Sequence, residues 1–546
     1  MGKPIRDVTI VGGGTAGWLA ASALARAFAM PGKVPPLKIT LIESPSIPPI
    51  GVGEASLPSL HALIEFLGID EREFVRRTNA AFKLGGRFVN WNHGPNGEPV
   101  DFLNIMNRPP DGVAGTVADL FLAFHPERDR PNAGREYARM VSPAVDLVDG
   151  YLGPFSAHKG PQSASVGYSY HFDAGELAKM MKARSIEMGT THILDDVDDV
   201  EQDENGLITA LKLRQHGRHA VQLVIDCTGF QSVLLGRQMD VPFESYERFL
   251  LNDRALVVQV PHADPTRIEP VTRLTGLESG WSFEVPLFNR VGTGYVFSSR
   301  FSSDDQALAE MTRHLGPRIE QGTPKFIPMK LGHRKRHWAG NVVAMGLSSG
   351  FIEPLEATAI YMVQFGVNML IKSWPTQDYE PELAQRFDRR MNRLYDEIRD
   401  FVACHFYLNN RTDSAYWTAA REAVEIPDSL RQNLELWKQT LPATEDMQSQ
   451  QVFAYNVYTL VLIAKNYYKG RELPASRLLN RDFWNYMQRQ LKAQRDSIVP
   501  DLPDHYTLLR QMRGELPIRP PASAGLARKS GKGPTTLRER RRKARQ

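Results

Sequence analysis

Lys83 lies in an apolar stretch, NAAFKLGGRFVNW at residues 79–91, between Phe82 and Leu84. Lysine is rarely buried without a partner, so its position has two explanations. A snorkelling lysine would bury only its apolar stem and keep its ammonium in water. A catalytic lysine would instead present its ammonium or amine to a reactant in a site that excludes water.

A second group of residues indicates a nucleotide site. It begins in RDVTIVGGGTAGWLAASALARAF, an apolar strand followed by a glycine turn and a helix, where Gly12, Gly14 and Gly17 fit G-x-G-x-x-G. The next apolar strand, LKITLIE, ends at Glu43, 26 residues after Gly17. Such glycines let backbone N–H groups and a helix dipole approach a pyrophosphate, while the acid accepts hydrogen bonds from a ribose. This pattern predicts a bound dinucleotide.

Two later segments favour FAD over NAD as that dinucleotide. One is HAVQLVIDCTGF at residues 219–230, a strand that runs into a turn at Gly229, as is typical of late FAD-binding Rossmann segments. The other is GNVVAMGLSSGFIEPLEATAI at residues 340–360, which repeats the order strand, glycine loop, helix. The sequence has no second G-x-G-x-x-G to hold NAD(P)H. The simpler alternative for residues 219–230 is one more parallel strand that ends in a turn.

These elements predict an α/β fold, a Rossmann-type FAD-binding module with an inserted β-rich substrate region and a C-terminal helical region. The strand-like segments DRALVVQVP, GWSFEVPL and GTGYVFSS support the β-rich insertion. Three parts are predicted: an FAD-binding and substrate module at 1–375, a helical substrate-capping region at 376–516 and a basic disordered tail at 517–546. Within the first part we assign FAD-binding segments to about 5–60, 161–240 and 331–375, and substrate-side segments to about 61–160 and 241–330.

Composition and charge narrow the class of protein. The 546-residue chain is 42% hydrophobic and 23% charged, which is ordinary for a globular protein. From Arg519 onward there are ten Lys and Arg residues and one acidic residue, Glu539, so this tail carries a net charge of +9, whereas that of the whole chain is +4. Residues 1–518 therefore carry about −5, and this charge does not predict nucleic-acid binding. The simpler interpretation of the tail is a solubilising extension.

The sequence also limits where the protein can be located and whether it binds a metal. Only Cys227 and Cys404 are present, so no disulfide framework is predicted and a reducing cytoplasm fits best. No apolar run of about 18 residues predicts a membrane span. The glycines at 12–14 break the apolar stretch after Lys3 and Arg6, so we reject a signal peptide. No metal site is predicted.

Five motifs together carry a resemblance to a known family. They are GGGTAGW (12–18), GVGEASLPSL (51–60), AFKLG (81–85), GWSFEVPL with GTGYVFSS (280–299) and GLSSGFIEPLEAT (346–358). In order and spacing they resemble the flavin-dependent tryptophan halogenases, over roughly residues 5–420. Each motif is weak alone, and the set is highly specific.

The resemblance implies roles for individual residues. Lys83 would be the catalytic lysine and Glu356 its carboxylate partner, and Thr358 and Ala359 would bind a halide through backbone N–H groups. The alternative for Glu356 is an acid placed at a helix N-terminus by the dipole, and Glu353 is interpreted as a structural acid of that turn. Residues implied to bind the cofactor are Gly12, Gly14, Ala16, Gly17, Glu43, Val52, Ala55, Val197, Gly229, Leu347 and Ile360.

The resemblance also implies a reaction. A separate NADH-dependent flavin reductase would supply FADH2, which with O2 gives a flavin hydroperoxide, and chloride or bromide would attack its distal oxygen to give HOX. Lys83 would then deliver the halogen to a small aromatic substrate, either by hydrogen-bonding HOX or as a haloamine. Glu356 would hold the lysine or HOX and deprotonate the cationic ring intermediate.

The chain departs from the family pattern on the substrate side. The W-x-W-x-I-P segment reads Trp281-Ser-Phe283-Glu-Val-Pro286, which keeps an aromatic wall with one indole fewer. The loop DFLNIMNRPPDGVAG at 101–115 has no histidine, although tryptophan-specific members place a His and a Phe there. We therefore expect a bare indole, another electron-rich aromatic or a larger substrate in place of free tryptophan.

Two rival functions remain open at the level of the sequence. A flavin monooxygenase that hydroxylates an aromatic ring would share the FAD site, but direct oxygen transfer requires neither Lys83 nor Glu356. A non-catalytic flavin-binding protein could use the basic tail to find a partner. A homodimer is one option for the assembly.

Overall fold

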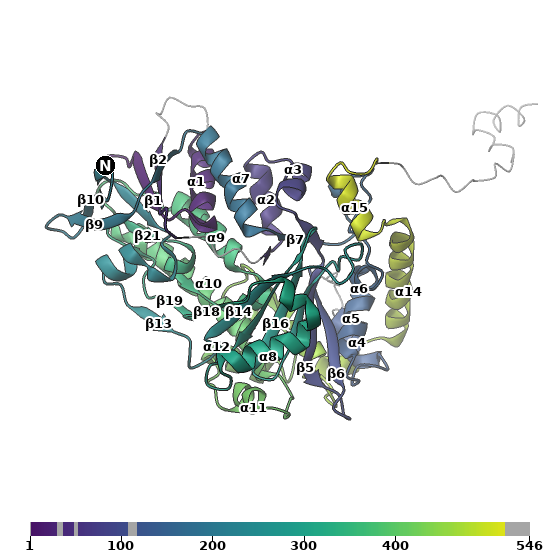
Figure 1. The fold of residues 1–546 in the computed structure, drawn as a ribbon. Helices are drawn as coiled ribbons and strands as arrows, with labels where there is room; N and C mark the ends of the chain where they lie inside the picture. The colour runs from purple at the N-terminus through teal and green to yellow at the C-terminus, as the bar shows by residue number, and fades with distance from the viewer. Residues whose placement is uncertain (1, 30–36, 48–52, 107–116, 519–546) are drawn as a thin grey trace, which may run out of the picture.

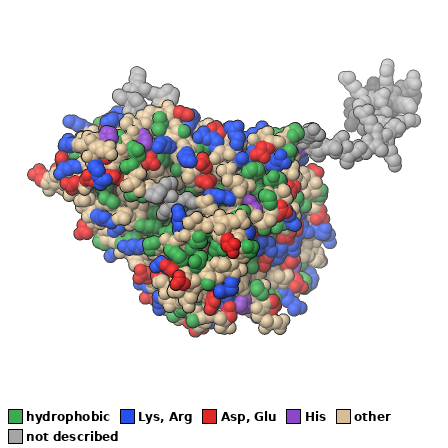
Figure 2. Space-filling model, viewed as in Figure 1, with side chains coloured by type: hydrophobic (Ala, Val, Ile, Leu, Met, Phe, Trp, Pro, Cys, Tyr) green, Lys and Arg blue, Asp and Glu red, His purple; other side chains and the backbone are tan. Residues whose placement is uncertain are grey.

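The computed structural model describes residues 2–29, 37–47, 53–106 and 117–518, and Val52 of the predicted cofactor set lies outside these ranges. The molecule contains two large sheets (Figure 1). One includes β1 (Asp7–Val11) and β2 (Lys38–Glu43), and the other includes β14 (Arg254–Val260) and β16 (Gly280–Pro286). On the face seen in Figure 2, acidic and basic side chains are interspersed. Every helix within the described ranges is too short or too polar to cross a bilayer.

The first sheet is six-stranded and largely parallel, with β20 alone antiparallel to its neighbour. Its central strands are buried along most of their length, as expected for a parallel sheet covered on both faces, whereas the edge strand at Thr191–Leu194 is partly exposed. In spatial order they are β20 (Trp338–Ala339), β21 (Val342–Ala344), β12 (Leu223–Asp226), β1 (Asp7–Val11), β2 (Lys38–Glu43) and β8 (Thr191–Leu194).

Different elements cover the two faces of this sheet. Val8 and Ile10 of β1 point into the main core, where α1 (Thr15–Phe28) packs against α7 (Ala174–Glu187) and α9 (Ala359–Lys372). Val11 points into a second core on the other face. There the antiparallel strands β9 (Val197–Gln202), β10 (Ile208–Leu213) and β11 (Gly217–Ala220) close the layer. The predicted α/β class is therefore confirmed.

The second sheet has seven strands that come from two insertions in the chain. All neighbours are antiparallel except β15 and β5, which are parallel. The order is β18 (Lys325–Pro328), β14 (Arg254–Val260), β17 (Val291–Phe297), β16 (Gly280–Pro286), β15 (Thr272–Gly276), β5 (Gly85–His93) and β6 (Pro99–Ile105). The predicted β-rich insertion is confirmed, and α8 (Asp304–Leu315) covers one end of it.

A small three-stranded sheet ties the two large ones together. Its central strand β7 (Ser169–Phe172) pairs antiparallel with β3 (Glu54–Ala55) on one side and with β4 (Ala81–Lys83) on the other. The segment that carries Ala55 and the strand that carries Lys83 are thus held by one intervening strand.

A further three-stranded sheet is formed by β13 (Phe243–Ser245), β19 (Gly332–Arg334) and β22 (Gly350–Phe351), and the other long elements are α-helices. The N-terminal half contributes α2 (Ser59–Phe66), α3 (Glu71–Arg77), α4 (Val117–Phe124), α5 (Ala133–Val141) and α6 (Ala144–Asp149). The C-terminal part contributes α10 (Pro381–Tyr407), α11 (Ala415–Glu422), α12 (Asp428–Leu436), α13 (Tyr455–Ala464), α14 (Arg481–Ile498) and α15 (His505–Met512). The division of the chain at residues 375 and 516 stays a prediction.

The C-terminal helix α15 is tied directly to the strand of Lys83. His505 at its first position accepts a hydrogen bond from the Phe82 N–H at Nε2 (3.1 Å) and contacts the Ile268 carbonyl through Nδ1 (2.9 Å). Only a neutral imidazole can donate at one nitrogen and accept at the other. Burial lowers the pKa of His505 to about 4.

This histidine predicts an acid-labile link. The folded pKa lies below the ordinary value, so the unfolded chain binds the extra proton first and stability falls as pH drops from about 6.5 to about 4. His505→Gln keeps an acceptor and cannot titrate. We expect the wild type to lose up to about 3 kcal/mol relative to this variant over that interval. Urea unfolding at half-unit pH steps measures the difference, and parallel curves for the two proteins would contradict it.

Candidate active site

The glycine turn between β1 and α1 forms an open anion-binding end. Gly12 has φ +119°, and a Cβ there would lie 2.2 Å from the Cys227 carbonyl oxygen, so only glycine lets the two turns approach. Gly14 is the N-cap of α1 and supplies no side-chain cap, and no atom lies within 4 Å of where its Cβ would be. Ala16 and Gly17 follow in the first turn of the helix. Free N–H groups at a helix start suit a pyrophosphate.

The carboxyl ends of the parallel strands bring other predicted residues to the same edge. Gly229 opens the short helix that follows β12, and Leu347 lies in the 3-10 helix that follows β21. Gly346, beside Leu347, lies against the Ala16 side chain. Ile360 is in the first turn of α9, which packs against α1. The structure therefore groups these residues around the glycine turn.

Glu43 closes β2 beside that turn. Its side chain lies flat over Gly13, where a Cβ would come within 2.3 Å of the Glu43 Cγ. The carboxylate Oε2 is 3.1 Å from Lys182 Nζ and 2.8 Å from His192 Nε2. Asp195 N–H donates to the Glu43 carbonyl, which brings Val197, two residues on, to the same end of β2. Glu43 is thus held at the place where a ribose would be recognised, and these residues fit an FAD adenosine.

Lys83 is buried at the end of β4. The residue is 4% exposed, and Nζ donates to the Ser56 carbonyl at 3.3 Å, in the loop that follows Ala55. Burial lowers the pKa of Lys83 to about 8, and the charge of Glu356 opposes that shift. A snorkelling lysine needs its ammonium in water, which this position does not provide.

Glu356 reaches the same interior from a short 3-10 helix, Pro354–Glu356. Its Oε1 accepts a hydrogen bond from Asn104 Nδ2 at 3.0 Å and lies 3.2 Å from His405 Nε2. Asn104 can reach it because Gly85 lets the two strands of the β5–β6 hairpin close up: a Cβ at Gly85 would lie 2.4 Å from the Asn104 carbonyl oxygen. The carboxylate is therefore held from β6 and α10.

The turn after Glu356 exposes backbone donors. Ala357 has φ +57°, a left-handed conformation that costs a residue with a Cβ about 1 kcal/mol. Thr358 is then the N-cap of α9 and Ala359 its first residue, and no side chain caps this end. Their N–H groups have no acceptor within the part of the chain that the structure describes. Such donors suit a small anion such as a halide.

The predicted substrate-side aromatics face the loop before Glu356. Trp281 is fully buried and donates through Nε1 to Glu353 Oε2 at 2.7 Å. Phe283 lies against it with ring centroids 6.0 Å apart. Asn252 donates to the same Glu353 oxygen at 2.8 Å, and burial raises the pKa of Glu353 to about 7. Glu353 thus anchors Trp281, in keeping with a structural acid.

The sequence analysis missed three residues of this region. Asn104 and His405 both contact Glu356, and Lys465 lies near them, bonded to Asn92 Oδ1 at 2.7 Å and 5.3 Å from the Trp91 ring centroid. Lys465 could have been found by the argument used for Lys83, because TLVLIAKNYY also places a lysine in an apolar run. No local pattern marks Asn104 or His405.

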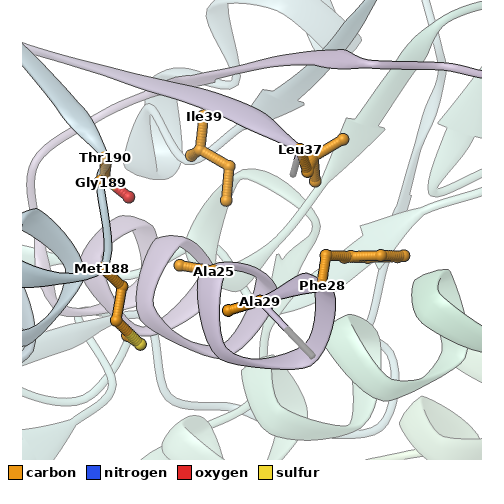
Figure 3. A pocket seen from close by; sticks show the side chains of 8 residues that line it. All are labelled: Ala25, Phe28, Ala29, Leu37, Ile39, Met188, Gly189 and Thr190. Atoms are coloured by element: carbon orange, nitrogen blue, oxygen red, sulfur yellow. The ribbon is translucent and has the colours of Figure 1, made fainter. Parts of the chain in front are cut away.

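A small cleft of about 20 Å³ lies elsewhere, at the C-terminal end of α1 (Figure 3). The 14 residues of α1 place it about 20 Å from the glycine turn. Its lining side chains are apolar except for Thr190, and none of the predicted site residues is among them. The lining residues are Ala25, Phe28, Ala29, Leu37, Ile39, Met188, Gly189 and Thr190.

Comparisons with known proteins show what the whole chain is similar to. The family model for tryptophan halogenase matches residues 7–479. Tryptophan 7-halogenase RebH from Lentzea aerocolonigenes is 34% identical over 473 residues, which cover 82% of this chain and 85% of that protein. The crystal structure of tryptophan 6-halogenase SttH from Streptomyces toxytricini superposes with a TM-score of 0.85 at 32% identity, covering 92% of this chain and 99% of that one. BrvH, a flavin-dependent halogenase from Brevundimonas sp. BAL3, gives 0.81 at 31% identity, with 93% and 99% covered.

The position of Glu43 predicts its part in cofactor affinity. Glu43→Ala removes the acceptor at the end of β2 and leaves Lys182 and His192 unpaired, so FAD binding should weaken by about 1–3 kcal/mol. Titration of FAD followed by flavin fluorescence gives the dissociation constant. Glu43→Gln, which keeps one acceptor oxygen, is the matched control and should lose less. An unchanged dissociation constant for Glu43→Ala would refute the assignment.

Proposed function

Because the chain belongs to the tryptophan halogenase family of flavin-dependent enzymes, we propose that it chlorinates or brominates an indole-like aromatic and that Lys83 delivers the halogen. The family's activity is halogenation of indole or tryptophan, and flavin-dependent halogenases rely on a separate flavin reductase. The observation that carries the finer proposal is the buried Lys83 ammonium, placed between the Ser56 carbonyl and the charge of Glu356.

FAD would be held by the glycine turn, Glu43 and the strand-end loops at Gly229 and Leu347. Bound as FADH2 it would supply two electrons that activate O2, and the activated oxygen would oxidise a halide to hypohalous acid. The residues of the chain then have separate tasks. The N–H groups of Thr358 and Ala359 hold the halide, and the small sheet β3–β7–β4 fixes Lys83 beside the Ala55 loop.

Lys83 can act in either of two ways. As an ammonium it donates a hydrogen bond to the oxygen of hypohalous acid and polarises the halogen. As a neutral amine it exchanges a proton for the halogen, releases water and becomes a haloamine. A pKa of about 8 lets both forms be populated near neutral and mildly alkaline pH. Glu356 accepts the proton that the ring loses once the carbon–halogen bond has formed.

Burial supports the confinement that this chemistry needs. Phe82, Leu84 and Phe88, which surround Lys83 in the chain, are fully buried. A dry wall strengthens the electrostatic effect of Lys83 and Glu356 and keeps a reactive oxidant from solvent.

Replacing Lys83 tests the proposal. In an assay with reductase, NADH, FAD, bromide and indole, Lys83→Ala should lower product by about a hundredfold or more, while reduced flavin is still reoxidised and oxidant appears in solution. Lys83→Met fills the space without an amine and should fail equally. Lys83→Arg keeps the cation and cannot form a haloamine, so it distinguishes the two modes. A Lys83→Ala enzyme that halogenates at nearly the wild-type rate would contradict the role.

A second prediction concerns substrate choice. Asn104 lies on the predicted substrate loop, and its side-chain amide donates a hydrogen bond to Glu356. Residues 107–115 of that loop lie outside the described residues. The loop lacks the histidine of tryptophan-specific members, so indole should be halogenated in preference to free tryptophan. Mass spectrometry of equimolar mixtures of indole and tryptophan measures the ratio. A preference for tryptophan would contradict this expectation.

A further inference from the structure

We propose that His405 is a positioning residue for Glu356: together with Asn104 it occupies Oε1 of the carboxylate and leaves Oε2 to Lys83 and the substrate. The proposal rests on the catalytic role proposed for Glu356. Asn104 Nδ2 lies 3.0 Å and His405 Nε2 3.2 Å from the same oxygen. Oε2 has no hydrogen-bond partner among the described residues, and the Glu356 side chain remains 11% exposed.

The surroundings of His405 fix its ring in place. The imidazole is fully buried on α10 and stacks on Phe88 with centroids 4.6 Å apart and planes 4° apart. Phe102 stacks on Phe88 in turn at 4.8 Å, and the Phe401 ring meets the imidazole edge-on at 4.9 Å. Rotation of the ring away from Glu356 would break this aromatic stack.

The polar atoms of His405 argue for more than packing. Neither ring nitrogen makes a well-aligned hydrogen bond within the described chain, because the Nε2–H does not point straight at Oε1. A buried, unsatisfied donor destabilises the folded state, so a phenylalanine would pack here at lower cost. Hydrogen bonds of this kind are often poorly aligned in a free enzyme and straighten when substrate binds.

Charges around the pair define the protonation states. Lys83 on β4 faces Glu356, Lys465 at the end of α13 faces His405, and Glu353 lies on the same 3-10 turn as Glu356. Burial lowers the pKa of His405, the neighbouring Glu356 opposes that shift, and Lys465 adds to it. Burial thus favours the neutral imidazole, which can donate one N–H towards Glu356.

In this arrangement the two oxygens of the Glu356 carboxylate have different roles. When the halogenated ring breaks its C–H bond, the electron pair restores aromaticity and the proton goes to Oε2. His405 stays neutral throughout and holds Oε1, so the acceptor oxygen does not rotate away. Loss of the imidazole N–H would leave Glu356 less well oriented and easier to protonate.

The test uses the full chain with reductase, NADH, FAD, bromide and indole. His405→Phe keeps the aromatic stack and removes the N–H donor, so product per reoxidised flavin should fall about tenfold, the loss of one hydrogen bond to a charged group. The acidic limb of the pH profile should move up by about one unit, because a carboxylate that loses a donor protonates more easily. His405→Gln restores an N–H and should return the limb toward its wild-type position.

A matched control separates packing from positioning. His333 is also buried in an aromatic stack, 4.8 Å from the Tyr395 ring, and it does not contact Glu356. His333→Phe should change thermal stability without moving the pH limb. If His405→Phe behaves like His333→Phe, with lower stability and an unchanged limb, His405 only packs and the proposal is overturned.

Glu356→Gln distinguishes this failure from failure of the proposed function. In a Glu356→Gln background, adding His405→Phe should have no further effect on product yield. Additive losses would show that His405 acts independently of Glu356 and would overturn the inference alone. If Glu356→Gln by itself keeps the wild-type activity and pH profile, Glu356 is not the proton acceptor. The positioning role of His405 is then overturned as well.

Discussion

The burial of one ammonium group constrains much of this structure. Lys83 is 4% exposed and its pKa falls to about 8, so the fold must offset the loss of hydration. It does so with one carbonyl, that of Ser56, and with the charge of Glu356. A lone buried ammonium would lose its proton more readily, and one in direct contact with a carboxylate would be held fully charged. The intermediate arrangement keeps both protonation states accessible, so that each of the two proposed modes of halogen delivery has the form of Lys83 that it needs.

The topology follows from the need to bring three distant segments to that ammonium. Ser56 follows β3, Lys83 ends β4 just before the second sheet, and Glu356 lies in the turn before α9. β7 joins the first two by pairing with β3 and β4 at once, and Asn104 links Glu356 back to the hairpin that follows Lys83. From the far side, His505 holds the backbone of Phe82. The lysine is therefore positioned by backbone pairing and has little freedom of its own.

What the sequence reveals depends on how local the physical signal is. The glycine turn can be recognised from the sequence because Gly12, Gly14 and Gly17 meet requirements set within one strand–turn–helix unit. The structure places these glycines between β1 and α1, as predicted. Glu43 and Lys83 are also marked locally, by the end of a strand and by an apolar run. Asn104 and His405 carry no such mark, since an amide on a strand and a histidine on an apolar helix face are common in cores. Their importance arises only when β6 and α10 meet at Glu356, which no single segment encodes.

Lys465 shows why an apolar run alone does not identify a catalytic lysine. It is as buried as Lys83, and its pKa falls further, to about 7. Its partners, however, are the Asn92 amide oxygen at 2.7 Å and the faces of Trp91 and Phe102 at 5.3 and 5.8 Å. These neutral groups satisfy a cation without offering a base for proton removal. Lys83 differs by having a carboxylate near it whose own oxygen is held by Asn104 and approached by His405. Proximity to an oriented carboxylate, more than burial, distinguishes Lys83 from Lys465 and supports the role proposed for Lys83.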